Sequence, residues 1–364
     1  MGEFAFHSRL SEDLYTAMYK WIGWLRGGMA MATIAGCAGF AAVCGENVAV
    51  ATTMGRVTLP EMKRYKYDST LATGCIAAGG TLGVLIPPSL AFILYGLLTE
   101  QSIGALFLAG IFPGILMAAL MILTIYILCR RNPRLGPPGP KTDLKDKIVS
   151  LRGIWGVLAL FALVMGGIYL GVFTPTEGAG IGAFGALVYT LVTRRFTRQG
   201  FVSALLGTNR ATAMALIILI GAVIFGIFMT VSKLPMTMAA LAVSLPLPPL
   251  VIFIFILFIF LILGCLMSAI AMLLLTVPVF YPVIISLGFD PIWTGVIMVL
   301  MWNIANITPP VGITVFVIKG VAPEIPLYSI FRGIIPFFIS MIVCVAILIA
   351  FPQIATFLPD LLGA

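Results

Sequence analysis

Two short stretches place helix-breaking residues inside apolar segments. Residues 79–89 read GGTLGVLIPPS, and residues 303–312 read NIANITPPVG. Paired prolines lack two main-chain N–H donors and clash with the preceding turn, so each pair should end a helix. Carbonyls left unpaired in lipid are tolerated only where they are buried in protein or line a wet cavity. Such carbonyls suit Na⁺, and the N-terminus of the next helix attracts anions. Each break is therefore predicted to hold a cation and to face a carboxylate.

Polar side chains stand beside both breaks, and polar groups inside a membrane are functional candidates. Ser and Thr also form local hydrogen bonds within helices, so a structural role stays open for them. The residues concerned are Thr81, Ser89, Asn303, Asn306 and Thr308.

Two apolar hairpins precede the breaks, and their tips are the natural partners of the breaks. The first tip is Cys44-Gly45-Glu46-Asn47, and the second is predicted around Gly264, over residues 264–268. A carboxylate in the middle of an apolar hairpin is costly. Glu46 should therefore have a partner or a role, or else be a protonated and merely tolerated carboxyl.

The elements that position these residues must be membrane helices. Of the 364 residues, 61% are hydrophobic and 9% are charged, and the mean hydropathy is +1.15. Long unbroken apolar runs indicate an all-α polytopic membrane protein and argue against a β-barrel. The net charge of +8 comes largely from short basic loops, which is a topology signal rather than a sign of nucleic-acid binding. The only histidine is His7, so a His-based metal site or catalytic triad is excluded, and an intramembrane enzyme is disfavoured.

The basic clusters give a consistent threading of the chain. Residues 56–67, 130–152 and 194–198 all fall on the cytoplasmic side. The predicted elements are an interfacial amphipathic helix (8–26), a hairpin (27–56), a broken helix (69–99) and a span (103–129), then a basic loop (130–152), spans at 153–173, 178–193 and 211–231, a re-entrant hairpin (250–281), a second broken helix (292–322) and a last span (328–351).

The chain also contains an internal repeat. The two Pro-Pro pairs lie 222 positions apart, at 87 and 309, and the same offset relates Pro60 to Pro282 and Asp68 to Asp290. Because the two copies enter the membrane from opposite sides, they form inverted repeats, which are typical of secondary transporters. We divide the chain into a first repeat (1–129), a cytoplasmic basic linker (130–152) and a second repeat (153–364). The same offset predicts that about 70 residues are absent from the start of the first repeat.

Four segments together resemble the large permease subunit of TRAP (tripartite ATP-independent periplasmic) transporters. They are GGTLGVLIPPS (79–89), LTEQSIGALFLAGIFPG (98–114), GVFTPTEGAG (171–180) and NITPPVGITVFVIKG (306–320). The resemblance implies an elevator-type transporter fold in the bacterial inner membrane and Na⁺-coupled import of organic acids by symport. It implies two partners, a small four-helix membrane subunit and a periplasmic substrate-binding protein, and no cofactor besides Na⁺ as the coupling ion.

The resemblance also implies where ions and substrate bind. The first cation site would comprise Gly45, Glu46, Asn47, Gly80, Thr81, Ile86 and Pro87. The second would comprise Gly264, Ser268, Asn303, Asn306, Thr308, Pro309 and Gly312, with Ser89 and Thr314 near the substrate.

Other interpretations stay open at this point. The chain could be a stand-alone sodium–carboxylate symporter of the same architecture, or a channel, although midplane breaks favour alternating access. Glu177, in TPTEG, is interpreted as a helix cap rather than a catalytic acid. The substrate is left open among C4-dicarboxylates, sialic acid, keto acids and other acids.

Overall fold

The structure is a computed structural model that describes residues 1–140, 142–244 and 246–363. In these ranges every regular element is helical. By length and composition, four helices can cross a membrane, or five if a bent pair counts as one span. They are α7 (Ile103–Arg131), α11 (Arg198–Ser232, of which residues 198–229 qualify), α13 (Pro249–Leu266) and α17 (Leu327–Ala350), and the bent pair is α8 (Leu144–Leu151) with α9 (Trp155–Tyr169). This agrees with the predicted all-α polytopic membrane fold.

The first half of the chain contains the predicted hairpin and broken helix. Two short helices, α1 (Gly2–His7) and α2 (Leu10–Ile22), come first. The hairpin is α3 (Gly28–Cys44) and α4 (Asn47–Arg64), with its turn at Gly45 and Glu46. The broken helix follows as α5 (Ser69–Gly80), a 3₁₀ turn η1 (Thr81–Val84) and α6 (Leu90–Thr99), and α7 completes this half.

Four helices join the two halves. After α8 and α9, α10 (Pro175–Val192) returns and α11 follows. The turn before α10 confirms the role predicted for Glu177. Thr174 N–H donates to Glu177 Oε2 at 2.8 Å, and Glu177 N–H donates to Thr174 Oγ1 at 3.3 Å, which forms a capping box.

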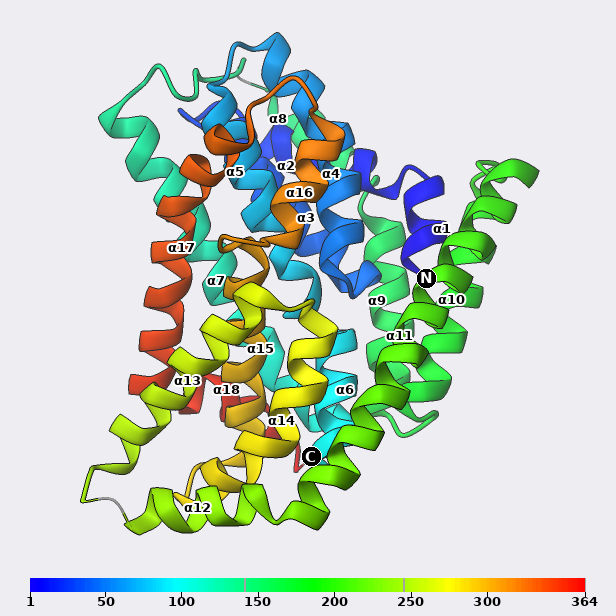
Figure 1. The fold of residues 1–364 in the computed structure, drawn as a ribbon. Helices are drawn as coiled ribbons and strands as arrows, with labels where there is room; N and C mark the ends of the chain where they lie inside the picture. The colour runs from blue at the N-terminus through cyan, green and yellow to red at the C-terminus, as the bar shows by residue number, and fades with distance from the viewer. Residues whose placement is uncertain (141, 245, 364) are drawn as a thin grey trace.

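The second half repeats the order of the first. An arm helix, α12 (Leu234–Ser244), leads to the hairpin of α13 and α14 (Ala269–Ser286). The second broken helix is α15 (Pro291–Ile307) and α16 (Ile313–Val321), and α17 follows it. Figure 1 shows that the chain descends from α5 to α6 but rises from α15 to α16, so the two broken helices run in opposite directions. Both Pro-Pro pairs, at 87 and 309, lie in breaks between helices, as predicted.

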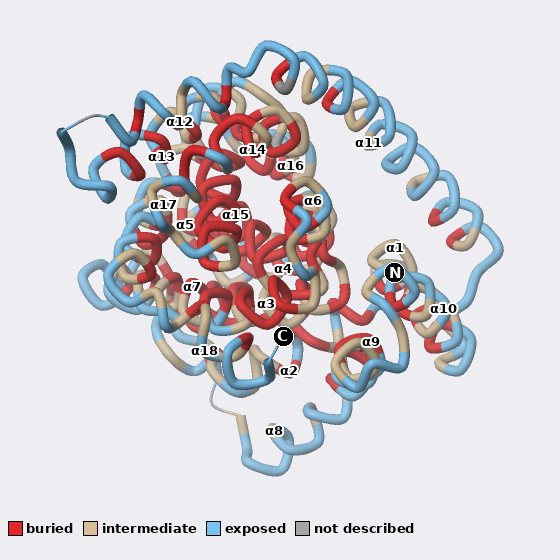
Figure 2. The backbone as a smooth tube through the Cα atoms, turned by 90° about the horizontal axis from the view of Figure 1, so that it is seen from below, coloured by how far each residue is buried: buried red, intermediate tan, exposed pale blue. Residues whose placement is uncertain are grey.

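The core lies where the two halves interlock. Every residue of α15 from Trp293 to Ile307 is buried, as is α5 from Leu71 to Gly80. A Cβ atom on Gly74 of α5 would overlap the Gly333 backbone of α17, so only glycine allows these two helices to pack this closely. Figure 2 shows the buried residues gathered around α15, α3 and α5, whereas α11 runs along the exposed periphery. The first break therefore lies in this buried centre, whereas Pro309 and Pro310 of the second break are exposed.

Four sequence predictions need correction. The basic loop contains a short helix, α8, none of whose residues is buried. Helix α11 begins at Arg198 rather than 211, since the more polar segment 198–210 is also helical. A final helix, α18 (Gln353–Leu362), follows the last span. The second hairpin turns at Met267 and Ser268, within the predicted tip (264–268) but beyond its predicted centre, Gly264, which is helical and lets α13 approach Ala305 and Met272.

Candidate functional site

The first hairpin tip lies directly against the first break, as predicted. Gly45 has φ +71°, and a Cβ atom there would lie 2.6 Å from the carbonyl oxygen of Pro88. The Gly45 carbonyl accepts a hydrogen bond from Leu90 N–H at 3.3 Å. A Cβ on Gly83 would lie 2.6 Å from the Glu46 carbonyl oxygen. Backbone therefore packs on backbone at both glycines, and Gly45 also has a positive φ, which glycine adopts without strain.

Glu46 has a local partner. Its carboxylate caps the N-terminus of α4 by accepting from Val48 N–H (3.0 Å) and Ala49 N–H (2.7 Å). Carboxylates at helix N-termini are stabilised by both hydrogen bonds and the helix dipole. This supplies the partner that the sequence required. Two main-chain donors do not exhaust the four lone-pair positions of a carboxylate, so the group can still accept.

Asn47 joins the first tip to both halves of the molecule. Its Oδ1 accepts from Val84 N–H of η1 at 3.0 Å, and its Nδ2 donates to Asn303 Oδ1 of α15 at 3.0 Å. Asn47 is 3% exposed and Asn303 is fully buried. This bridge spans 256 positions of sequence and links two residues that the sequence analysis had assigned to separate sites.

Several of the predicted hydroxyl groups form only local bonds. Thr81 donates to the carbonyl of Ala78 at 2.6 Å, and Thr308 donates to that of Ile304 at 2.6 Å. Ser268 caps α14 by accepting from Ala271 N–H at 3.4 Å. Ser89 caps α6, where it accepts from Phe92 N–H at 3.3 Å and donates to the Val84 carbonyl. The structural role that was left open for Ser and Thr therefore explains the contacts of these four hydroxyl groups.

A cavity of about 120 Å³ lies where both tips and both breaks meet. About 30 Å³ is the share of one liquid water, so the cavity matches a few waters or one end of a small solute. Its walls come from the first tip, the first break, α11, the second tip and the second broken helix: Glu46, Asn47, Val48, Val84, Leu90, Met214, Ser268, Ile270, Trp302, Asn306 and Ile313. Four of the predicted site residues, Glu46, Asn47, Ser268 and Asn306, thus surround one space.

The remaining predicted residues do not line this cavity. Gly80 ends α5, where a Cβ would lie 2.6 Å from Ala51 Cβ. Ile86 and Pro87 lie in the first break, and a Cβ on Gly114 of α7 would lie 2.7 Å from Ile86 Cγ1. Pro309 and Gly312 lie in the second break, and Thr314 follows in the first turn of α16. Sequence reasoning missed Trp302, because an indole in an apolar run carries no signal that distinguishes it from core packing.

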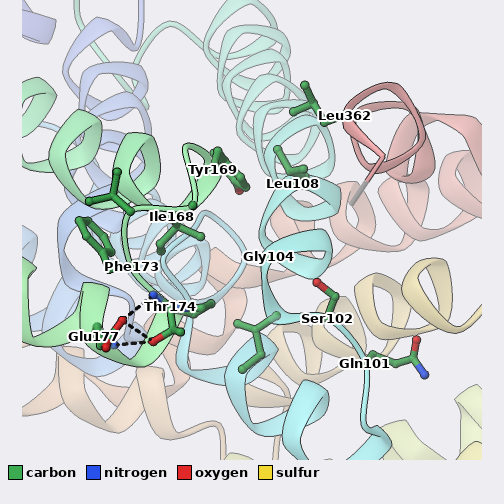
Figure 3. A pocket seen from close by; sticks show the side chains of 14 residues that line it. Gln101, Ser102, Gly104, Leu108, Ile168, Tyr169, Phe173, Thr174, Glu177 and Leu362 are labelled. Atoms are coloured by element: carbon green, nitrogen blue, oxygen red, sulfur yellow. Dashed lines mark hydrogen bonds between the residues drawn. The ribbon is translucent and has the colours of Figure 1, made fainter.

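A larger and more open cleft lies at the end of the molecule opposite the basic clusters. It measures about 720 Å³ and lies between the start of α7 and the turn before α10. Figure 3 shows the Thr174–Glu177 capping box on one side and Gln101 and Ser102 on the other. Glu177 is already occupied as a helix cap. The residues that line this cleft include neither hairpin tip and neither helix break. The small central cavity is therefore the candidate site.

Comparison with known proteins agrees with this arrangement. The family profile described as "Tripartite ATP-independent periplasmic transporter, DctM component" matches residues 1–354. This chain belongs to that family. Its members are large permease subunits of transporters that work with a small membrane subunit and a periplasmic binding protein. The family places the chain in the bacterial inner membrane as a multi-pass protein.

Individual TRAP relatives align over most of the chain. The C4-dicarboxylate TRAP transporter large permease protein DctM of Pseudomonas aeruginosa is 35% identical over 344 residues, which cover 94% of this chain and 80% of the relative. The sialic acid TRAP transporter large permease protein SiaM of Vibrio cholerae is 31% identical over 97% of this chain and 82% of its own length. The crystal structure of the Alcanivorax borkumensis YdaH transporter has the same fold. Its TM-score is 0.62 at 18% identity, with 97% of this chain and 86% of that chain covered.

Proposed function

We propose that this chain imports organic acids coupled to Na⁺, by alternating access, with its acids delivered by a periplasmic binding protein. The observation that supports this most strongly is the central cavity, which both hairpin tips and both breaks line. A cavity at such a junction can have its two sides opened in turn by movement of the hairpins. Relatives of the same family bear the names of a C4-dicarboxylate and of sialic acid, both organic acids.

We place the coupling cations beside the two breaks. In a continuous helix the carbonyl of Gly83 would pair with residue 87, and that of Asn306 with residue 310. Both partners are prolines without an N–H. Main-chain carbonyls that lose their helical partner become hard oxygen ligands, which suit Na⁺. One cation would lie between the first tip and the first break, and a second between the second tip and the second break.

The repeated order of elements supports a division into two functional units. We propose that residues 1–129 and 153–364 act as inverted repeats joined by the linker 130–152. Each unit contributes one hairpin and one broken helix to the cavity walls. Moving the hairpins against the peripheral helices would then expose the same site to either side in turn.

Reconstitution tests this proposal. The chain is placed in proteoliposomes with a small membrane subunit of a TRAP transporter, and a periplasmic binding protein is added outside. We expect uptake of at least one radiolabelled acid among succinate, sialic acid and isethionate. Uptake should require both an inward Na⁺ gradient and the binding protein. Uptake without the binding protein would instead support a stand-alone sodium–carboxylate symporter, and leak without any gradient would indicate a pore.

A further inference from the structure

The basic linker between the two repeats packs along the first half of the molecule. Its segment 135–140, which we call the brace, reads LGPPGP. The Leu135 carbonyl accepts a hydrogen bond from Asp68 N–H at 3.0 Å, and the Gly136 carbonyl accepts one from Gly27 N–H at 2.8 Å. Asp68 and Gly27 are the N-cap residues of α5 and α3. The brace therefore satisfies main-chain donors that both helices leave open at their starts.

Two further hydrogen bonds hold the brace in place. The Tyr67 hydroxyl donates to the Pro137 carbonyl at 2.9 Å and accepts from Met29 N–H, in the first turn of α3, at 3.2 Å. Tyr67 is 7% exposed, so water has little access to this node. Gly139 N–H donates at 2.9 Å to the carbonyl of Gly23, which ends α2, the arm helix of the first half. The brace thus joins the end of the arm to the starts of the hairpin and of the broken helix.

The brace packs closely against its neighbours and has a stiff backbone. A Cβ atom on Gly136 would lie 2.9 Å from Gly27 Cα and 3.0 Å from Cys129 Sγ. A Cβ atom on Gly139 would lie 2.6 Å from the Tyr19 hydroxyl oxygen. Three of the six residues of the brace are prolines, whose rings fix φ and limit other conformations of the segment. This part of the linker is therefore a preorganised clamp rather than a flexible tether.

In the described parts of the chain, the second half has no counterpart of the brace. Under the 222-residue offset, Tyr67 corresponds to Phe289, which has no hydroxyl and packs its ring against two other aromatic residues. Gly27 corresponds to Pro249, which has no N–H to donate. The brace corresponds to residues 357–362, which lie in α18. No main-chain hydrogen bond between described residues joins α18 to α13 or α15.

We propose that the brace holds the first hairpin rigidly against its arm helix α2, so that the two move as one body. Because the segment is stiff, separating them would break the hydrogen bonds along the brace together. The described residues give the second hairpin no such restraint. At the start of α13, Leu250 and Val251 are exposed, whereas α3 is buried over residues 28–34. In the transport cycle proposed above, the second hairpin is therefore the one that turns to open the central cavity. This last step rests on the proposed function, and the brace itself does not.

Amide hydrogen exchange of the purified chain in detergent tests the brace without any solute. Tyr67→Phe removes the hydroxyl that binds the brace and reproduces the residue of the second half. We expect exchange over residues 23–31 to become about tenfold faster, as for the loss of two ordinary hydrogen bonds, while exchange over residues 250–257 stays unchanged. Tyr95→Phe is the matched control, because its buried hydroxyl also donates to a proline carbonyl, that of Pro291, at 2.8 Å. The control should leave exchange over residues 23–31 unchanged.

A second variant acts on the brace from the other side. Gly136→Ala places a methyl group against Gly27 and should make exchange over residues 23–31 at least as fast as in Tyr67→Phe. Its control is Gly320→Ala, since no atom lies within 4 Å of a Cβ there. Exchange over residues 23–31 that is no faster in either brace variant than in the controls would overturn the inference, whether or not uptake occurs. If uptake fails but both brace variants exchange faster, the brace stands and the transport proposal falls.

Discussion

The first and second helix breaks differ in what caps the helix that follows them. At the first break, Ser89 accepts from Phe92 N–H and donates to the Val84 carbonyl. Under the 222-residue offset its counterpart is Val311, and the N-cap of α16 is Gly312, so neither has a side-chain oxygen. The offset also pairs Thr81, which bonds to its own helix, with Asn303, which reaches across to Asn47. The first break is thus internally satisfied, whereas the second has buried side-chain donors that lack a partner among the described residues.

This difference gives the two breaks unequal roles in stability. A break whose side chains are already hydrogen-bonded can form a fixed scaffold that presents main-chain oxygens. A break with unpaired donors carries their cost in the folded protein. The comparison therefore predicts that substitutions at the first break lower stability more than those at the second.

The largest effect should come from cutting the bridge between the two breaks. Asn47→Ala removes the acceptor for Val84 N–H and the donor for Asn303 Oδ1, and leaves both groups buried. Each unsatisfied group costs about 1–3 kcal/mol, so the free energy of unfolding should fall by about 2–6 kcal/mol. Thermal unfolding in detergent measures this. Asn132→Ala, which removes only an exposed loop contact to Arg134 N–H, is the control and should cost little.

A retained Tm in Asn47→Ala would contradict the bridge. It would mean that water replaces the lost amide at the junction, and that the two breaks are not held together by this side chain.

Two glycines offer a direct comparison of the breaks. Gly45 and Gly312 both have positive φ, +71° and +47°. A non-glycine residue in the left-handed region costs roughly 1–2 kcal/mol in either place. At Gly45 the new Cβ would also lie 2.6 Å from the Pro88 carbonyl oxygen, whereas at Gly312 the closest atoms lie at 3.3 Å. Gly45→Ala should therefore destabilise the protein more than Gly312→Ala, as chemical unfolding of both variants can show. The reverse order would mean that the first tip can move away from its break at little cost.

The sequence predicted the breaks well because their signal is local. Pro-Pro ends a helix wherever it stands, and the Glu46 tip was visible as a charge within an apolar run. The turn of the second hairpin lies within the predicted tip, but it is not centred on Gly264, because glycine there allows close packing rather than a turn. The Asn47–Asn303 bridge could not be predicted from the sequence, since the contact depends on how the first hairpin and the distant second broken helix fold together. Trp302 was missed for a similar reason, because only the structure reveals which buried donors lack a partner.

A smaller effect is expected from the helix cap at the first break. Ser89→Ala removes an acceptor for Phe92 N–H and a donor to the Val84 carbonyl, and loss of an N-cap costs about 1 kcal/mol. Ser268→Ala removes a longer cap, with 3.4 Å to Ala271 N–H, and should cost less. Unfolding of the two variants measures the difference. If Ser89→Ala instead weakened acid binding without lowering the Tm, the hydroxyl would belong to the solute site, and the contrast between the breaks would disappear.

The smallest effect should come from the exposed ion pair that joins the two halves. Lys63 Nζ lies 3.4 Å from Glu324 Oε1, and the side chains are 78% and 57% exposed. Main-chain hydrogen bonding at Glu324, followed by its bond to Lys63, lowers the pKa of this carboxyl below its usual value. A lowered folded-state pKa adds stability above the unfolded pKa, and this stability is lost as the pH falls through the folded value. Water and salt screen such an exposed pair, so Glu324→Gln should leave the Tm at neutral pH nearly unchanged. A Tm profile from pH 7 to pH 3 checks this: the parent chain and Glu324→Gln should differ little and converge at the acid end. A large difference at neutral pH would mean that this surface contact, rather than the buried Asn47 bridge, holds the two halves together.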